Sequence, residues 1–165
     1  MVPNNLDITI TWEGPFSTQE VIKLKKDYGV SPDWAGNDYG LYQIYGRHIL
    51  CGKKALLYVG IATDETYSDR FKIHNKEWLS KEKDIAIFLG RVYDTTRHSK
   101  SDNWRFWTKD IELVERILIY KYSPHYNYIG ISNPPDLSPN KIVRLIHEGK
   151  RGRLNIVDLA PKELN

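Results

Sequence analysis

One acidic residue, Glu115, stands where helical spacing predicts an apolar side chain. The segment 104–122 repeats apolar residues at intervals of three and four, which is typical of a helix with one face against the core. This stripe consists of Ile111, Glu115, Leu118, Ile119 and Tyr122. A carboxylate among apolar side chains is unfavourable unless it is paired or bound to a metal. Glu115 is therefore a candidate metal ligand, and the alternative is a partly buried glutamate held by an arginine or a tyrosine.

The neighbours of Glu115 in the sequence restrict the kind of metal. No cluster of His, Asp and Glu surrounds it, which argues against a multi-ligand zinc site. Mg²⁺ keeps several water ligands and needs few carboxylates from the protein. We therefore expect a hard divalent cation if Glu115 binds one.

Two tyrosines are set apart by strand alternation. In "YGLYQIYG" (39–46), Tyr42 points away from Tyr39 and Tyr45 if the segment is extended. In "ALLYVGI" (55–61), Tyr58 shares a face with Gly60, opposite a row of aliphatic residues. If the two segments pair as a hairpin, Tyr42 and Tyr58 stand side by side and the glycines leave room above the backbone. The alternative is that tyrosines simply favour strands.

A basic pair follows the second tyrosine. Arg70 and His74 are four residues apart, so they are neighbours on one face of a helix. The alternative interpretation is an exposed basic stripe that also includes Lys72 and Lys76.

The elements that would position these residues suggest a mixed fold. The predicted strands are 6–12, 39–45, 55–61 and 84–93, and the predicted helices are 20–26, 66–79, 104–122 and 139–147. The segment 46–54 is a plausible hairpin connection. We predict an α+β (mixed α/β) fold with a small, mainly antiparallel three-stranded central sheet flanked by helices.

The bulk properties favour one soluble domain. The chain has 165 residues and a formal net charge of +3, which suits a single domain over 1–165. No apolar run is long enough for a membrane span, and the first residues do not resemble a secretory signal, so we expect a cytoplasmic protein. The single cysteine, Cys51, excludes an internal disulfide and a multi-cysteine zinc site.

Basic residues gather in two segments that could contact nucleic acid, one near 97–105 and one at 141–153. The candidates are Arg97, Lys100, Arg105, Lys141, Arg144, Lys150, Arg151 and Arg153. The alternative for each segment is an ordinary solvated surface.

Together these residues resemble the motif order of a known family. Gly40–Tyr42 ("GLY"), Tyr58–Gly60 ("YVG"), the Arg70–His74 pair, Glu115, Pro124 and Tyr126–Asn127 ("YN") occur in the order found in the GIY-YIG nucleases. The resemblance covers about residues 38–130. The spacing from arginine to histidine is most similar to the restriction enzymes of that family.

The resemblance implies hydrolysis of a DNA phosphodiester with one divalent metal, Mg²⁺ or Mn²⁺. It makes Glu115 the metal ligand and Tyr42 the general base or the group that positions the attacking water. His74 would hydrogen-bond Tyr42 and help to draw off its proton, and Tyr58 would orient water or the phosphate. Arg70 would bind the phosphate. Further, Asn127 would hold the geometry of the site, and either Lys53 or Lys54 could support Tyr42.

The length of the chain favours a compact restriction-type endonuclease acting on DNA. A homodimer would suit a palindromic target. One alternative is a structure-specific or repair-type nuclease of the same family. The others are a non-catalytic DNA-binding module and an accidental match of motifs.

Overall fold

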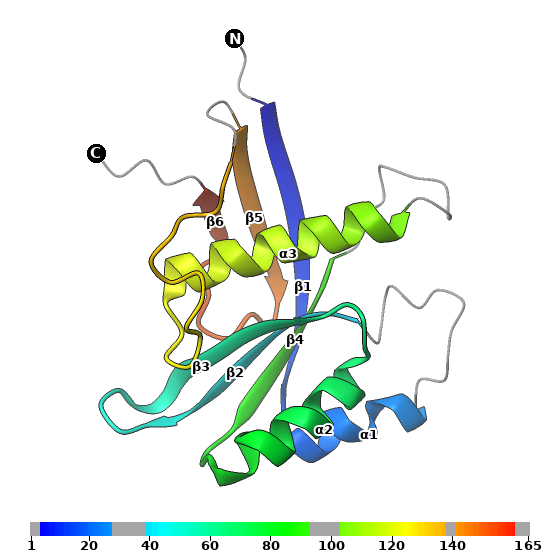
Figure 1. Cartoon of the computed structure of the whole chain (residues 1–165), viewed down its shortest axis with the longest axis vertical. Helices are drawn as coiled ribbons and strands as arrows, with labels where there is room; N and C mark the ends of the chain where they lie inside the picture. The colour runs from blue at the N-terminus through cyan, green and yellow to red at the C-terminus, as the bar shows by residue number, and fades with distance from the viewer. Residues whose placement is uncertain (1–3, 28–38, 93–102, 138–140, 161–165) are drawn as a thin grey trace.

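The computed structural model describes residues 4–27, 39–92, 103–137 and 141–160. Strands dominate the chain (Figure 1). In chain order the elements are β1 (Asn4–Phe16), α1 (Thr18–Asp27), β2 (Gly40–His48), β3 (Gly52–Ala62), α2 (Tyr67–Glu77), η1 (Leu79–Lys81), β4 (Ala86–Val92), α3 (Asn103–Tyr122), β5 (Lys141–Gly149) and β6 (Val157–Ala160). In the described part of the chain, no helix is both long and apolar enough to cross a membrane.

The predicted three-stranded sheet is wrong, because the strands form one six-stranded mixed sheet that curls into a half-barrel. The strand order is β3-β2-β4-β1-β5-β6. The three strands predicted at the centre, β2, β3 and β4, are neighbours, but they occupy only one half of the sheet. The long strand β1 joins the two halves, since it pairs antiparallel with β4 and parallel with β5.

The predicted helix 139–147 is also wrong, because residues 141–147 belong to β5 (Lys141–Gly149), while 139 and 140 lie outside the described residues. Val143, Leu145 and His147 are buried, whereas Arg144 between them is exposed, which is the two-residue alternation of a strand. The parallel partner of β5 is β1, which lies at the other end of the sequence. The other predicted helices and strands are present with shifted ends, and β6 is an addition.

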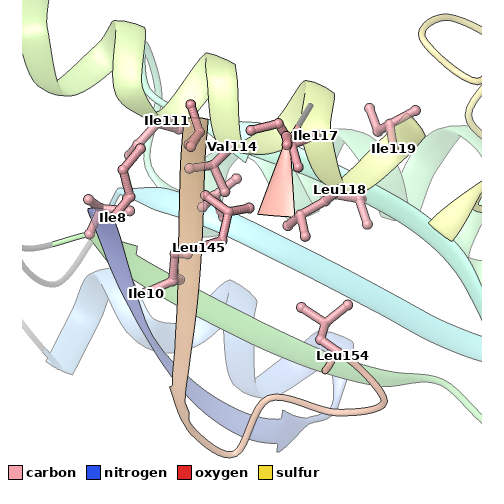
Figure 2. Packing of buried hydrophobic residues seen from close by; sticks show 14 of the residues in the cluster. Ile8, Ile10, Ile111, Val114, Ile117, Leu118, Ile119, Leu145 and Leu154 are labelled. Atoms are coloured by element: carbon pink, nitrogen blue, oxygen red, sulfur yellow. The ribbon is translucent and has the colours of Figure 1, made fainter. Parts of the chain in front are cut away.

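Two hydrophobic clusters cover the sheet. In the first, α3 packs on β1 and β5, and Figure 2 shows Ile111, Val114 and Leu118 of α3 close to the strand residues. In the second, α1 and α2 pack beside each other on the β2–β4 half (Figure 1). Neighbouring residues of β2 enter different clusters, Leu41 the first and Tyr42 the second. The alternation predicted for the segment 39–45 is thus confirmed at these two positions.

Candidate active site

The hydroxyl of Tyr42 lies at the centre of a buried group of side chains. Its oxygen is 2.7 Å from Nε2 of His74 and accepts a hydrogen bond of 3.3 Å from Nε of Arg70. The rings of Tyr42 and Tyr58 are stacked with their centroids 6.0 Å apart. The Phe71 ring packs edge-on against the Tyr42 ring, with 5.0 Å between the two ring centroids. The structure therefore brings together Tyr42, Tyr58, Arg70 and His74.

Gly60 makes room for the Tyr42 hydroxyl. Tyr42 and Gly60 are directly paired across β2 and β3. A Cβ atom at position 60 would lie 2.5 Å from the Tyr42 oxygen and 2.7 Å from the Tyr58 ring. Such distances are far inside van der Waals contact, so only glycine permits this arrangement of the two tyrosines.

Helix α2 presents three side chains of this group at intervals of one turn. Thr66 caps the helix by accepting from the backbone N–H of Asp69. Arg70, His74 and Trp78 then follow at i, i+4 and i+8, with Trp78 immediately beyond the end of the helix. The spacing places all three on the side that faces the tyrosines.

Trp78 determines which nitrogen of His74 carries the proton. The indole N–H can only donate, and it lies 3.1 Å from Nδ1 of His74. Burial, followed by the charge of Arg70, lowers the pKa of His74 to about 4, so the ring is neutral near pH 7. Nδ1 is then the acceptor and Nε2 carries the proton, which points toward the Tyr42 oxygen.

Arg70 is held between Tyr42 and an acidic neighbour. Its Nη1 forms an ion pair of 3.1 Å with Glu65, and both side chains are about one-third exposed, at 34% and 33%. A guanidinium has five N–H groups, and these two contacts use only part of them. Arg70 can thus hold Tyr42 and still offer donors to an anion from solvent.

Glu115 is half-buried on α3, and burial raises its pKa to about 7. The charge of Arg70 lowers the pKa of Glu115, and the charge of Glu112 raises it further. Among the described residues, no hydrogen bond or ion pair reaches the Glu115 carboxylate. A partly buried carboxylate without such a partner suits a hard cation that keeps water ligands.

Electrostatics link Glu115 to the tyrosines. Burial raises the pKa of Tyr58, and the charge of Glu115 is the next largest cause. For Tyr42, burial and then Tyr58 raise the pKa well above its usual value, while Arg70 opposes them. The carboxylate thus lies close enough to influence both hydroxyls, as required if all three serve one site.

Asn127 binds the backbone of β3 beside Tyr58. Its Oδ1 accepts from the N–H of Val59 and its Nδ2 donates to the C=O of Val59, both at 2.9 Å. Because β3 is an edge strand, this amide takes the place of a neighbouring strand at Val59. Asn127 therefore fixes the backbone between Tyr58 and Gly60.

The predicted supporting lysines lie far from Tyr42. Lys53 and Lys54 are exposed near the hairpin turn. Lys54 is six residues along β3 from Gly60, the partner of Tyr42, which corresponds to roughly 20 Å. Neither lysine supports the tyrosine.

The predicted DNA-contacting residues are spread over β5 and the turn after it. Arg144 pairs with Asp7, Arg151 donates to the C=O of Leu154 at 2.9 Å, and Arg153 donates to the C=O of Lys54 at 3.2 Å. Lys141 is half-buried and Lys150 is exposed. Arg97, Lys100 and the Arg105 side chain lie outside the described residues.

Sequence reasoning did not identify two residues of the candidate site, Trp78 and Glu65. Trp78 could have been identified from the sequence, because it lies four residues after His74 within the predicted helix. Glu65 precedes the helix, and nothing in its spacing distinguishes it from other surface acids.

Comparisons of the chain with protein-family models, curated proteins and solved structures find no significant match.

Proposed function

We propose that the protein is a metal-dependent DNA endonuclease of the GIY-YIG type. The observation that carries this proposal is the Tyr42 hydroxyl, which receives N–H groups from Arg70 and His74 beside a half-buried carboxylate, Glu115. These residues are also those that the sequence resemblance assigns to the site. They come from β2, α2 and α3, so their proximity is not a consequence of local sequence.

Tyr42 is the group assigned to the attacking water; its side chain is fully buried in the free protein, so this role requires that water reaches the hydroxyl when metal and DNA bind. Two N–H donors on its oxygen stabilise the phenolate, and the charge of Arg70 adds to this. Burial works against ionisation, so Tyr42 is neutral in the free protein. As a neutral phenol it can position water through its O–H; as a phenolate it can take a proton from that water.

His74 acts on Tyr42 as a hydrogen-bond donor. Because Trp78 occupies Nδ1, the neutral ring donates from Nε2 and favours a negative oxygen on Tyr42. This differs from the role implied by the resemblance, in which His74 helps to withdraw the tyrosine proton.

Glu115 would hold the cation, Mg²⁺ or Mn²⁺. When bound, such an ion stabilises the negative charge that develops on the phosphate and favours ionisation of water. Arg70 supplies N–H donors to the same phosphate, and Tyr58 orients the water or a phosphate oxygen from the adjacent strand.

The restriction-type assignment rests on the Arg70–His74 spacing, which matches that branch of the family. It implies cleavage at defined sequences in duplex DNA, and a homodimer where the target is palindromic. A repair-type enzyme would instead act on branched or damaged DNA.

The proposal is tested by incubating the protein with plasmid DNA and Mg²⁺ or Mn²⁺, followed by sequencing of the new ends. We expect metal-dependent fragments of defined sequence. Glu115→Ala and Tyr42→Phe should each reduce cleavage by at least about a hundredfold. The matched control is Glu112→Ala, which removes an exposed carboxylate from the same helix and should retain activity.

Two outcomes would count against the proposal. No cleavage of any plasmid or branched DNA with either metal would argue for a non-catalytic protein. Full activity of Glu115→Ala would remove the metal assignment.

A further inference from the structure

Three side chains with metal-binding chemistry meet at the end of the β2–β3 hairpin. His48 ends β2, Cys51 lies in the turn, and His125 follows α3. One ligand atom from each lies within 4.8 Å of the other two. In the described part of the chain, no other group of His, Cys, Asp and Glu side chains converges in this way.

The fold brings these residues together without help from a metal. The backbone N–H of His125 bonds to the C=O of Leu56 at 3.3 Å, and that of Tyr126 bonds to Leu57 at 2.8 Å. The imidazole rings of His48 and His125 are stacked, with centroids 4.0 Å apart and planes 9° from parallel. Two of the three groups are therefore already held in contact across segments far apart in sequence.

We propose that His48, Cys51 and His125 form a binding site for Zn²⁺ or a cation of similar preference. Imidazole nitrogen and thiolate sulfur are the ligands that Zn²⁺ favours, and a tetrahedral ion places them about 3.4 to 3.6 Å apart. The three ligand atoms already lie within 4.8 Å of one another, and because an imidazole lone pair lies in the ring plane, one of the two stacked rings must also turn to face the ion. Cys51 and His125 are exposed, so their side chains can make that adjustment, and the fourth ligand is water.

The binding of a metal by His48 replaces one existing contact. Nδ1 of His48 accepts a long hydrogen bond of 3.3 Å from the backbone N–H of Leu50. A neutral imidazole has one proton, so coordination through either nitrogen gives up this bond. The bond is solvent-exposed, and its loss should have little effect.

This site differs in chemistry from that of Glu115. Glu115 offers oxygen to a hard cation such as Mg²⁺, whereas the His48–Cys51–His125 cluster offers nitrogen and sulfur. A cation here would link the hairpin turn to the segment that continues into Asn127. The site is thus a structural clamp, independent of the proposed nuclease chemistry.

The test uses the metal-free full chain titrated with Co²⁺ and then Zn²⁺. We expect one equivalent of Co²⁺ to produce the thiolate charge-transfer absorption and visible bands of a tetrahedral site, and Zn²⁺ to abolish them. Because Cys51 is the only cysteine, its rate of reaction with an aromatic disulfide reports on this site alone. Zn²⁺ should slow that reaction and raise the melting temperature.

Variants separate this site from other metal binding. Cys51→Ser should abolish the charge-transfer band, and His48→Asn and His125→Asn should each weaken Zn²⁺ binding by about tenfold or more. Leu50→Ser, in the same exposed turn, and Glu115→Gln should leave Zn²⁺ affinity unchanged. The proposal is overturned if no stoichiometric binding occurs, if the spectrum persists in Cys51→Ser, or if neither histidine substitution weakens binding.

Discussion

Replacing Glu115 with glutamine is expected to stabilise the protein above neutral pH. The ordinary pKa of this carboxyl is 4.5, and burial in the fold raises it to about 7, with Arg70 opposing the rise and Glu112 adding to it. At pH 8 the wild-type protein therefore holds a partly buried negative charge. Glutamine has the same shape without that charge.

The sign and size of the effect follow from proton linkage. Between pH 4.5 and about 7 the folded state binds more protons at Glu115 than the unfolded state, so the free energy of unfolding falls as pH rises. The full difference corresponds to at most about 3.4 kcal/mol, since each pKa unit is worth about 1.4 kcal/mol. Glu115 is partly exposed, and solvent screening reduces the expected effect to roughly 2 kcal/mol.

Denaturant unfolding of wild type and Glu115→Gln at about pH 5 and about pH 8 measures this effect. We expect the variant to be more stable by roughly 2 kcal/mol at the higher pH, and most of that advantage to vanish at the lower pH. Saturating Mg²⁺ should stabilise the wild type selectively and reduce the difference. Glu112→Gln is the control, because its carboxylate is exposed.

A constant difference between wild type and variant at both pH values would refute the reasoning. It would mean that Glu115 titrates normally and that burial does not perturb it. If Mg²⁺ does not stabilise the wild type, the electrostatic argument still holds, but Glu115 is not a ligand of the cation.

Three further predictions concern the surroundings of the site. Trp78→Phe removes the N–H that fixes the His74 tautomer. Cleavage should then fall about tenfold and the pKa of His74 should rise. The nitrogen NMR shifts of His74 should report a mixture of tautomers. Unchanged shifts would contradict this role. Gly60→Ala should displace Tyr42, lower the free energy of unfolding by about 1 to 3 kcal/mol in thermal unfolding, and abolish cleavage. An active variant would show that the close approach of Tyr42 to residue 60 is not required. Asp158→Asn should lower the free energy of unfolding by about 3 to 5 kcal/mol in denaturant titrations. It removes the charge of a fully buried carboxylate that pairs with the partly exposed Lys121 and contacts the buried His147. A loss below about 1 kcal/mol would show that these contacts contribute little.

The Asp158 network also gives a pH dependence to stability. Burial raises the pKa of Asp158, but hydrogen bonds from His147 and Lys121, among others, outweigh burial and hold the pKa well below 3.8. Near the ordinary pKa of 3.8, the unfolded state therefore binds more protons at Asp158 than the folded state does. The stabilisation is present above about pH 4 and is lost as the carboxylate becomes protonated in acid.

The strands that carry the tyrosines were predictable because their pattern is local. Apolar residues alternate in 55–61, and the glycines at 40 and 60 leave space on one face. Alternation separated Tyr42 from Leu41, and the structure places them in different hydrophobic clusters. The stripe on α3 likewise revealed Glu115 as an exception to apolar spacing.

The rest of the sheet was not predictable in the same way, because its pairing is non-local. The segment that forms β5 has a proline before it and a glycine at its end, which are also helix signals. Val143, Leu145 and His147 alternate with more exposed residues as in a strand, which the helix prediction did not take into account. What decides the outcome is pairing with β1, whose residues lie at the other end of the chain.

The polar network behind β5 illustrates the same limit. Trp12 donates to Nδ1 of His147 at 3.0 Å, and Nε2 of His147 lies 3.2 Å from Asp158. Each of these residues is ordinary in its own segment. Only the six-stranded arrangement brings β1, β5 and β6 close enough for the three to connect.

The pairing of Asn127 with Val59 has a consequence for solubility. The amide covers a backbone N–H and C=O that would otherwise face outward from the edge strand β3, and the N–H groups of His125 and Tyr126 cover the C=O groups of Leu56 and Leu57. An uncovered strand edge can pair with a strand from another molecule. Loss of Asn127 would therefore open this edge to intermolecular pairing, so that a single substitution would cause aggregation as well as disturb the proposed active site.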